Sequence, residues 1–244
     1  MPPSRTPPFE PTAASAACSG PTPWSHELVR RVRYRFVLKA LGITGFMWVF
    51  FLAYFHLLRN PARPVITMPL TAVDHWVAFE PLALAAYVSL WVYVGIPAGL
   101  MRSLHHLLVY GLWIGALCLS GLACFYLVPT AVPAMPLPVD VALHPGFALL
   151  QGVDASGNAC PSLHVATAVF SALWIDHLLR GMAAPAWTRV GNAAWALLIV
   201  WSTLATKQHV ALDVAAGTLL ALLFAAPSMR WFPADAPWQS EGGR

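Results

Sequence analysis

Charged residues are scarce in this chain of 244 residues: only 10% are Asp, Glu, Lys or Arg, whereas 58% are apolar. A soluble domain carries roughly 25% charged residues, so this chain could not form an ordinary water-facing surface. Cysteine is also sparse, with four in the whole chain, which excludes a small secreted domain held by disulfides. The apolar content excludes disorder over most of the length. What remains is an all-α polytopic membrane protein.

Six apolar runs approach the length of a transmembrane helix. A bilayer core of about 30 Å needs roughly 20 apolar residues per helix. We therefore expect a bundle of six transmembrane helices, over residues 40–58, 81–100, 107–128, 162–179, 190–206 and 210–226. The last two runs are short and closely spaced, and one re-entrant pair is the alternative there.

The basic residues predict the orientation of these helices. Lys and Arg are enriched on the cytoplasmic side of membrane proteins. An N-terminus inside the cell places eleven of the fourteen Lys and Arg residues on that side and leaves Arg59, Arg63 and Lys207 outside. Both termini are therefore predicted to be cytoplasmic. The expected location is a bacterial inner (plasma) membrane.

The ends of the chain differ in composition from its centre. Residues 1–29 are rich in Pro, Ser, Thr and Ala and are expected to form a disordered cytoplasmic tail, followed by a membrane domain over residues 30–228 and a second tail over 229–244. The net charge of +4 comes mostly from the Arg cluster before the first apolar run. Such a cluster indicates contact with anionic lipid and not with nucleic acid. The sequence predicts no oligomeric state.

Polar side chains gather at the outer ends of the last three predicted helices. Ionisable residues at membrane depth are costly, so each of them is a functional hypothesis. One group lies within residues 158–164, a second is Lys207-Gln208-His209, and the third is Asp213. Between His164 and His209 the chain makes one span inward and one span back. Both histidines are therefore expected at the same outer face.

The spacing of His209 and Asp213 predicts a nucleophilic pair. Residues i and i+4 are neighbours on one helix face. A carboxylate there fixes the imidazole tautomer and leaves the other ring nitrogen free to attack. His164 supplies a second imidazole as the acid. A His–Asp pair alone also occurs as a purely structural contact, so the prediction depends on the whole cluster.

An anion site is predicted beside this pair. Pro161 is typical of a first helical turn, and the free N–H groups at that turn together with the Ser162 hydroxyl favour a bound anion. Lys207 adds a cation two residues before His209. Ser162 and Lys207 are therefore candidate phosphate-binding residues, although Lys207 alone is also typical of a lysine at the membrane surface.

Two motifs carry a resemblance to a known family. Pro161-Ser162-Leu163-His164 and the segment from Lys207 to Asp213 resemble the type 2 phosphatidic acid phosphatase superfamily, and more narrowly its inositol phosphorylceramide synthase-like branch. Residues 68–74 and 126–133 are also similar to stretches of that branch, and the resemblance covers roughly residues 36–228. It implies a metal-independent attack on a phosphoester, with a phosphohistidine on His209, without a cofactor.

The chain departs from the superfamily pattern at three places. Leu163 replaces the glycine of the first motif, as it does in the synthase-like branch. Thr203 stands where the second motif has an arginine, and we expect Lys207 to substitute for it. The superfamily's K-x6-R-P element has no good match just before the Pro161–His164 motif. Residues 56–64 fit its spacing with His56 for its lysine, but they lie after the first apolar run; this match makes Arg63 a third candidate for phosphate binding.

The sequence thus predicts an integral-membrane lipid phosphate phosphatase that acts at the outer membrane face. No Cys and His residues have the spacing of a zinc site. The expected partner is a membrane lipid, whose identity the sequence does not give. Two alternatives stay open: a phosphotransferase that moves a phosphorylated headgroup between lipids, and a transporter or lipid-binding protein without catalysis.

Overall fold

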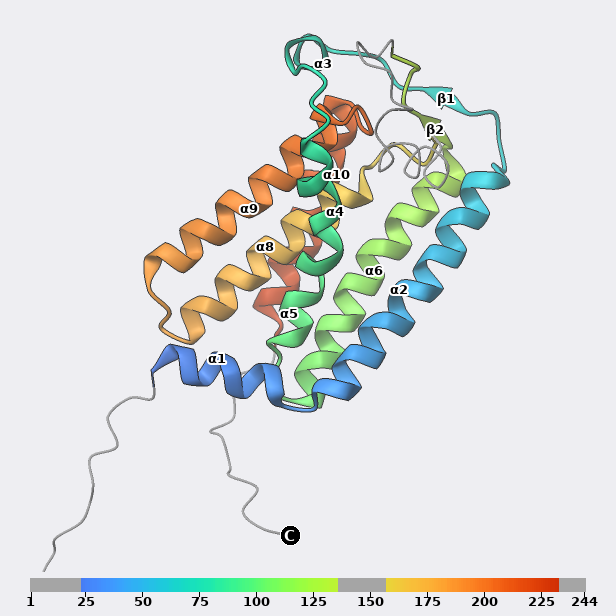
Figure 1. Cartoon of the computed structure of the whole chain (residues 1–244). Helices are drawn as coiled ribbons and strands as arrows, with labels where there is room; N and C mark the ends of the chain where they lie inside the picture. Colours follow the sequence, from blue (N-terminus) through green and yellow to red (C-terminus); the bar gives the residue numbers. More distant parts are fainter. Residues whose placement is uncertain (1–22, 136–156, 233–244) are drawn as a thin grey trace, which may run out of the picture.

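The apolar runs fold into helices that lie side by side in a bundle (Figure 1). The computed structural model describes residues 23–135 and 157–232. Each of the six predicted runs is helical. Five of them are single helices: α2 (Phe36–Arg59), α6 (Leu104–Leu127), α8 (Leu163–Gly181), α9 (Ala186–Ala205) and α10 (Ala211–Arg230).

The second run is broken into two helices. They are α4 (Ala83–Tyr93) and α5 (Gly95–Gly99), which are joined at Val94. Gly95 lowers helix propensity at this point, and Pro97 lacks the N–H that a continuous helix would use. The predicted run over residues 81–100 is therefore helical from Ala83 to Gly99, with an interruption at Val94.

Three helices are long and apolar enough to cross a membrane: α2, α6 and α10. The segment Ala83–Gly99 is a shorter apolar helix. The chain is accordingly a mostly helical integral membrane protein. α8 carries Asp176, His177 and Arg180 within its sequence, which makes it less apolar than α6. The count of six spans and the direction of the termini stay predictions.

α8 lies at the centre of the bundle and packs on α9, α10, α6, α4 and α5. Its contact with α10 depends on small residues at four-residue spacing: Gly217, Ala221 and Ala225 are all buried. Small residues let helix backbones approach closely in membrane proteins. A Cβ at Gly217 would overlap the carbonyl oxygen of Ser162, so only glycine permits this approach.

The two ends of the bundle are covered differently (Figure 1). At one end lies α1 (Trp24–Arg33), whose Leu28 packs against the core. Its start at Trp24 makes the last residues of the predicted N-terminal tail helical. The rest of that tail, residues 1–22, and residues 233–244 of the second tail lie outside the described residues.

The opposite end carries α3 (Ala72–Trp76) and a short sheet. β1 (Ile66–Thr67) pairs in parallel with β2 (Thr130–Ala131). This sheet departs from the predicted all-α class. β1 lies just before the stretch 68–74, and β2 lies within 126–133; directly after the sheet, the N–H of Met68 donates to the carbonyl oxygen of Ala131 at 2.9 Å, which brings these two stretches together. The same end holds the starts of α8 and α10, and therefore the predicted site.

Candidate active site

The starts of α8 and α10 are joined directly at this end of the bundle. The backbone N–H of Ser162 donates to the carbonyl oxygen of Asp213 at 3.1 Å. His164 lies two residues beyond Ser162, and His209 lies four residues before Asp213. Both imidazoles line the same cavity. The structure therefore brings together the two histidines that the sequence placed at one face.

Hydrogen bonds fix the backbone on both sides of His209. Its own N–H donates to the carbonyl oxygen of Thr203 at 3.1 Å, and the N–H of Val210 donates to Oδ2 of Asp213 at 3.0 Å. Nδ1 of His209 lies 3.5 Å from that same Oδ2. Asp213 has no exposed surface. Because Nδ1 faces the carboxylate, Nε2 is the nitrogen left for chemistry.

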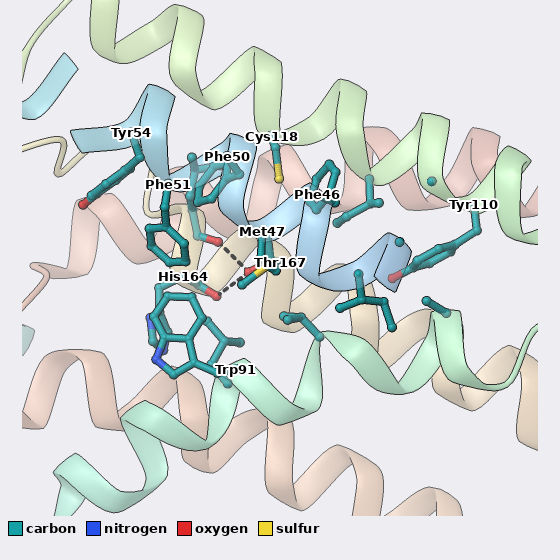
Figure 2. Close-up of a pocket in the computed structure, with 18 of the residues that line it drawn as sticks. Phe46, Met47, Phe50, Phe51, Tyr54, Trp91, Tyr110, Cys118, His164 and Thr167 are labelled. Atoms are coloured by element: carbon teal, nitrogen blue, oxygen red, sulfur yellow. Dashed lines mark hydrogen bonds between the residues drawn. The ribbon is translucent and has the colours of Figure 1, made fainter. Parts of the chain in front are cut away.

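Aromatic rings hold His164 in place from the side of α4. Tyr87 stacks on its imidazole, with ring centroids 4.0 Å apart and an interplanar angle of 20°. The ring of Trp91 meets the same imidazole edge to face, with ring centroids 6.1 Å apart, and Figure 2 shows Trp91 beside His164 in the pocket. Neither aromatic residue was predicted, because the period of an apolar helix does not reveal which ring meets a histidine.

Several polar atoms of this cluster are buried without a hydrogen-bond partner. Among the described residues these include Nε2 of His164, Nδ1 of His209 and Oδ1 of Asp213. Buried polar atoms in proteins are normally paired, and leaving one unpaired costs about 1–3 kcal/mol. Their concentration at one place is typical of a site that binds or transforms a ligand.

Ser162 is the N-cap of α8. Its Oγ accepts from the N–H of Val165 at 3.2 Å, and the residue has no exposed surface. The helix begins at Leu163, so Pro161 precedes the cap and is not in the first turn as predicted. The hydroxyl oxygen that the sequence assigned to phosphate has a structural partner here. Its phosphate-binding role stays a prediction.

Lys207 and Arg63 do not line the cavity. Lys207 has a left-handed backbone, with φ of 57°, and its Nζ donates to the carbonyl oxygens of Asp74, at 2.9 Å, and of Val77. Burial lowers the pKa of the Lys207 ammonium, and the Asp74 carboxylate opposes that shift. Arg63 is exposed in the segment between α2 and β1. The phosphate-binding roles of both residues stay predictions.

Asp74 of α3 is part of this region, and the sequence placed it on the outer side, where it could shape the substrate entrance. Its Oδ1 accepts from the N–H of Ala211 at 2.7 Å, at the start of α10, and its Oδ2 accepts from the N–H of Thr71 at 2.7 Å. The residue is buried. Its place in the 68–74 stretch, which resembles the family, was a further signal in the sequence. α3 is thereby attached to the loop that carries His209.

The cavity beside the histidines has a volume of about 810 Å³. Its walls are mostly aromatic and aliphatic side chains of α2, α4 and α6, and its few polar lining residues include both histidines. A mostly apolar pocket with a few polar groups suits an amphiphilic ligand.

Comparison with known proteins agrees with this geometry. A family model described as PAP2 superfamily matches residues 116–236, a range that contains both histidines, Asp213 and the helices α8, α9 and α10. The chain belongs to the PAP2 superfamily. Its membership and its apolar helices fit a membrane lipid phosphatase or phosphotransferase. The comparisons with curated proteins and with solved structures gave no match.

Proposed function

We propose that the protein is a lipid phosphate phosphatase that works through a phosphohistidine on His209. One observation carries the proposal: His209, with the Asp213 carboxylate behind its Nδ1, shares the wall of an apolar cavity with His164. Membership of the PAP2 superfamily supports the reaction class. Residues with these roles in a membrane-embedded cavity suit a phosphate ester with a hydrocarbon tail.

In the first step Nε2 of His209 attacks the phosphorus atom of the ester. A phosphorus–nitrogen bond forms as the bond between phosphorus and the lipid oxygen breaks. Nε2 of His164 donates its proton to that leaving oxygen, and the carboxylate of Asp213 stabilises the charge on the His209 ring through Nδ1. The lipid leaves as an alcohol.

In the second step water resolves the phosphoenzyme. His164, now neutral, takes a proton from the water as its oxygen attacks the phosphorus atom. The phosphorus–nitrogen bond breaks, inorganic phosphate is released, and both histidines return to their starting protonation states. An alcohol on a second lipid would complete the same step by becoming phosphorylated.

The proposal is tested by comparing three histidine variants of the full chain in detergent. His209→Ala and His164→Ala remove the reacting groups, whereas His105→Ala removes an exposed histidine at the start of α6, at the other end of the bundle. Release of phosphate from a phosphorylated lipid should fall about 10²-fold or more in the first two variants and stay near the wild-type rate in the third.

Trapping and product analysis separate the remaining possibilities. Quenching the wild type in alkaline SDS after reaction with radiolabelled substrate should yield a base-stable, acid-labile phosphoprotein that His209→Ala does not form. If His209→Ala hydrolyses lipid at the wild-type rate, the mechanism is wrong. If the label passes to an added lipid alcohol in place of water, the activity is a transferase with the same histidine.

A further inference from the structure

The cavity at the histidines extends far beyond the reacting groups. It follows α2 from Phe55, near His164, to Leu38 and Lys39 close to the opposite end of the bundle. We call this space the chain groove, with a His164 end and a Lys39 end. In Figure 2, His164 lies at one end of the drawn pocket and Tyr110 at the other, with Phe46 and Met47 between them.

We propose that the chain groove holds a hydrocarbon chain of the substrate that is long enough to pass the middle of the bilayer. This inference deepens the proposed function, because it assumes that a lipid phosphate reacts at the His164 end. The ligand class it names is a phosphate ester of a long-chain lipid, of the polyprenyl kind, and not one whose chain ends within a single leaflet.

The length of the groove carries this inference. At 1.5 Å per helical residue, the stretch of α2 from Leu38 to Phe55 is about 25 Å long. One leaflet contributes only about 15 Å, half of the roughly 30 Å hydrocarbon core. A chain that fills the groove from the histidines to the Lys39 end therefore extends past the midplane.

The walls suit a hydrocarbon and little else along most of this length. Phe46 and Phe50 of α2 line the groove together with Leu90 of α4, and Phe51 of α2 lines it in contact with Trp91 of α4. Burial of apolar surface stabilises a bound chain by about 25 cal/mol per Å². No charged side chain lines the groove within the described residues except Lys39 at its far end and the histidines at its near end.

Lys39 closes the far end without offering a free charge to a ligand. The residue is buried, and its Nζ donates to the carbonyl oxygens of Arg31, at 2.6 Å, and of Gly99, at 2.7 Å. These bonds tie the start of α2 to α1 and to the end of α5. The Lys39 ammonium already donates hydrogen bonds within the protein. The Lys39 end of the groove is therefore suited to the end of a hydrocarbon chain and not to a second headgroup.

The groove is open to the surrounding lipid along one side. Its lining includes side chains that are more than half exposed, Leu108 and Leu112 of α6. Lys39 is the one buried residue of α2, so that helix is loosely packed on the bundle. A long chain can therefore enter sideways from the bilayer, and it does not need to thread through the histidine end.

Two glycines leave space in the groove that a larger side chain would fill. Gly42 of α2 and Gly111 of α6 both line it, and a Cβ at either position would meet nothing within 4 Å. Gly45 lies on the same helix as Gly42 and is equally open, but it does not line the groove. Gly42 and Gly45 therefore form a matched pair for a steric test.

The test compares Gly42→Phe with Gly45→Phe on two substrates, farnesyl phosphate and undecaprenyl phosphate. A Phe at Gly42 occupies the groove near its Lys39 end, where only the longer chain reaches. The wild type should prefer the longer substrate by kcat/KM. Gly42→Phe should lower the long-to-short ratio about tenfold or more, and Gly45→Phe should leave that ratio at the wild-type value.

Gly111→Phe is a second groove variant, on α6. It replaces Gly42→Phe if thermal unfolding in detergent shows that Gly42→Phe is not folded. Equal kcat/KM for the two substrates in the wild type, or equal ratios in the groove variants and Gly45→Phe, would overturn the inference. His209→Ala in the same assay distinguishes failure of the two proposals. If this variant still hydrolyses the substrates, the phosphohistidine mechanism is wrong, but the proposal for the chain groove is not affected.

Discussion

Asp213 serves two partners with one oxygen atom. Its Oδ2 accepts from the N–H of Val210 and also faces Nδ1 of His209 at 3.5 Å. The first contact caps α10, and the second orients the imidazole. The two roles require different things of the side chain: the cap needs an acceptor, whereas the imidazole that becomes charged during the reaction needs a negative charge.

This difference predicts distinct effects of two substitutions at Asp213. Asp213→Asn keeps an acceptor for Val210 but loses the charge, so lipid hydrolysis should fall about 10²-fold or more while the melting temperature changes little. Asp213→Ala loses both and should also lower the free energy of unfolding by about 1–3 kcal/mol. Rate assays and thermal unfolding check the two parts, and an Asn variant with the wild-type rate would contradict the orienting role.

Gly217 sets the distance between α8 and α10. Because a Cβ there would overlap the Ser162 carbonyl, Gly217→Ala must push the two helices apart, and it should destabilise the protein by about 1–3 kcal/mol. Gly191→Ala on α9 is the control, since its Cβ would meet nothing within 4 Å. In thermal unfolding, the melting temperature of Gly217→Ala should be lower than that of the wild type, and that of Gly191→Ala should equal or exceed it. The reverse order would show that α8 and α10 are not closely packed at Gly217.

At this scale the sequence predicted which candidate residues lie together better than it predicted their surroundings. The i, i+4 spacing paired His209 with Asp213, and their side chains are 3.5 Å apart. The predicted shared helix face is wrong, because α10 begins at Ala211 and His209 lies in the loop before it. The partners of Lys207 are carbonyl oxygens from a distant segment, and no residue pattern marks a carbonyl. The same is true of Thr203, whose carbonyl oxygen accepts from the N–H of His209.

At the scale of elements, α3 acts as a strap across the loop between α9 and α10. The Asp74 carboxylate accepts from the N–H of Ala211, and Lys207 donates to the carbonyl oxygens of Asp74 and Val77. Just beyond α3, the N–H of Glu80 donates to the carbonyl oxygen of Ala205. These bonds span the loop on both sides of His209. The position of the imidazole therefore depends on a segment more than 130 residues earlier in the chain.

Asp74→Ala should loosen this strap and lower turnover more than binding. Without the carboxylate the N–H of Ala211 is left unpaired, so kcat should fall about tenfold or more while KM changes little. Asp74→Asn keeps an acceptor oxygen and should restore most of the rate.

The control for the strap is Asp176→Ala, which breaks an ion pair with Arg180 within α8 and one with Arg189 that joins α8 to α9. It removes a carboxylate of similar connectivity but should leave kcat near the wild-type value. Steady-state measurements of kcat and KM for the three variants test this prediction. Equal losses in Asp74→Ala and Asp74→Asn would mean that the charge matters and the hydrogen bond to Ala211 does not.

Helices were predictable here because apolar runs of about 20 residues admit few other structures in a membrane. The shorter elements were not. β1 and β2 have two residues each, too few for a period, and they pair only because distant loops meet. α1 begins inside the predicted tail because its periodic residues were hidden by the Pro-rich stretch before it.

At the scale of the whole molecule, the basic residues predict which end of the bundle faces the cytoplasm. Single cysteines in a background without the native ones test this. Ala62→Cys lies between α2 and β1, and Ala186→Cys lies at the start of α9, at the other end. In intact cells a membrane-impermeant maleimide should label the first and reach the second only after permeabilisation. The opposite pattern would place the histidines on the cytoplasmic side.

The close contact between Gly217 and Ser162 makes the reacting part of the protein a fixed unit, because α8 and α10 cannot separate without breaking it. This unit lies within the range matched by the family model, whereas α2 and α4, which line the chain groove, lie outside it. On the two proposals, the reacting histidines lie inside the matched range and much of the chain-groove wall lies before it. Exchanging the residues before α6 between members of the superfamily would then be a route to new lipid specificity with the same histidines.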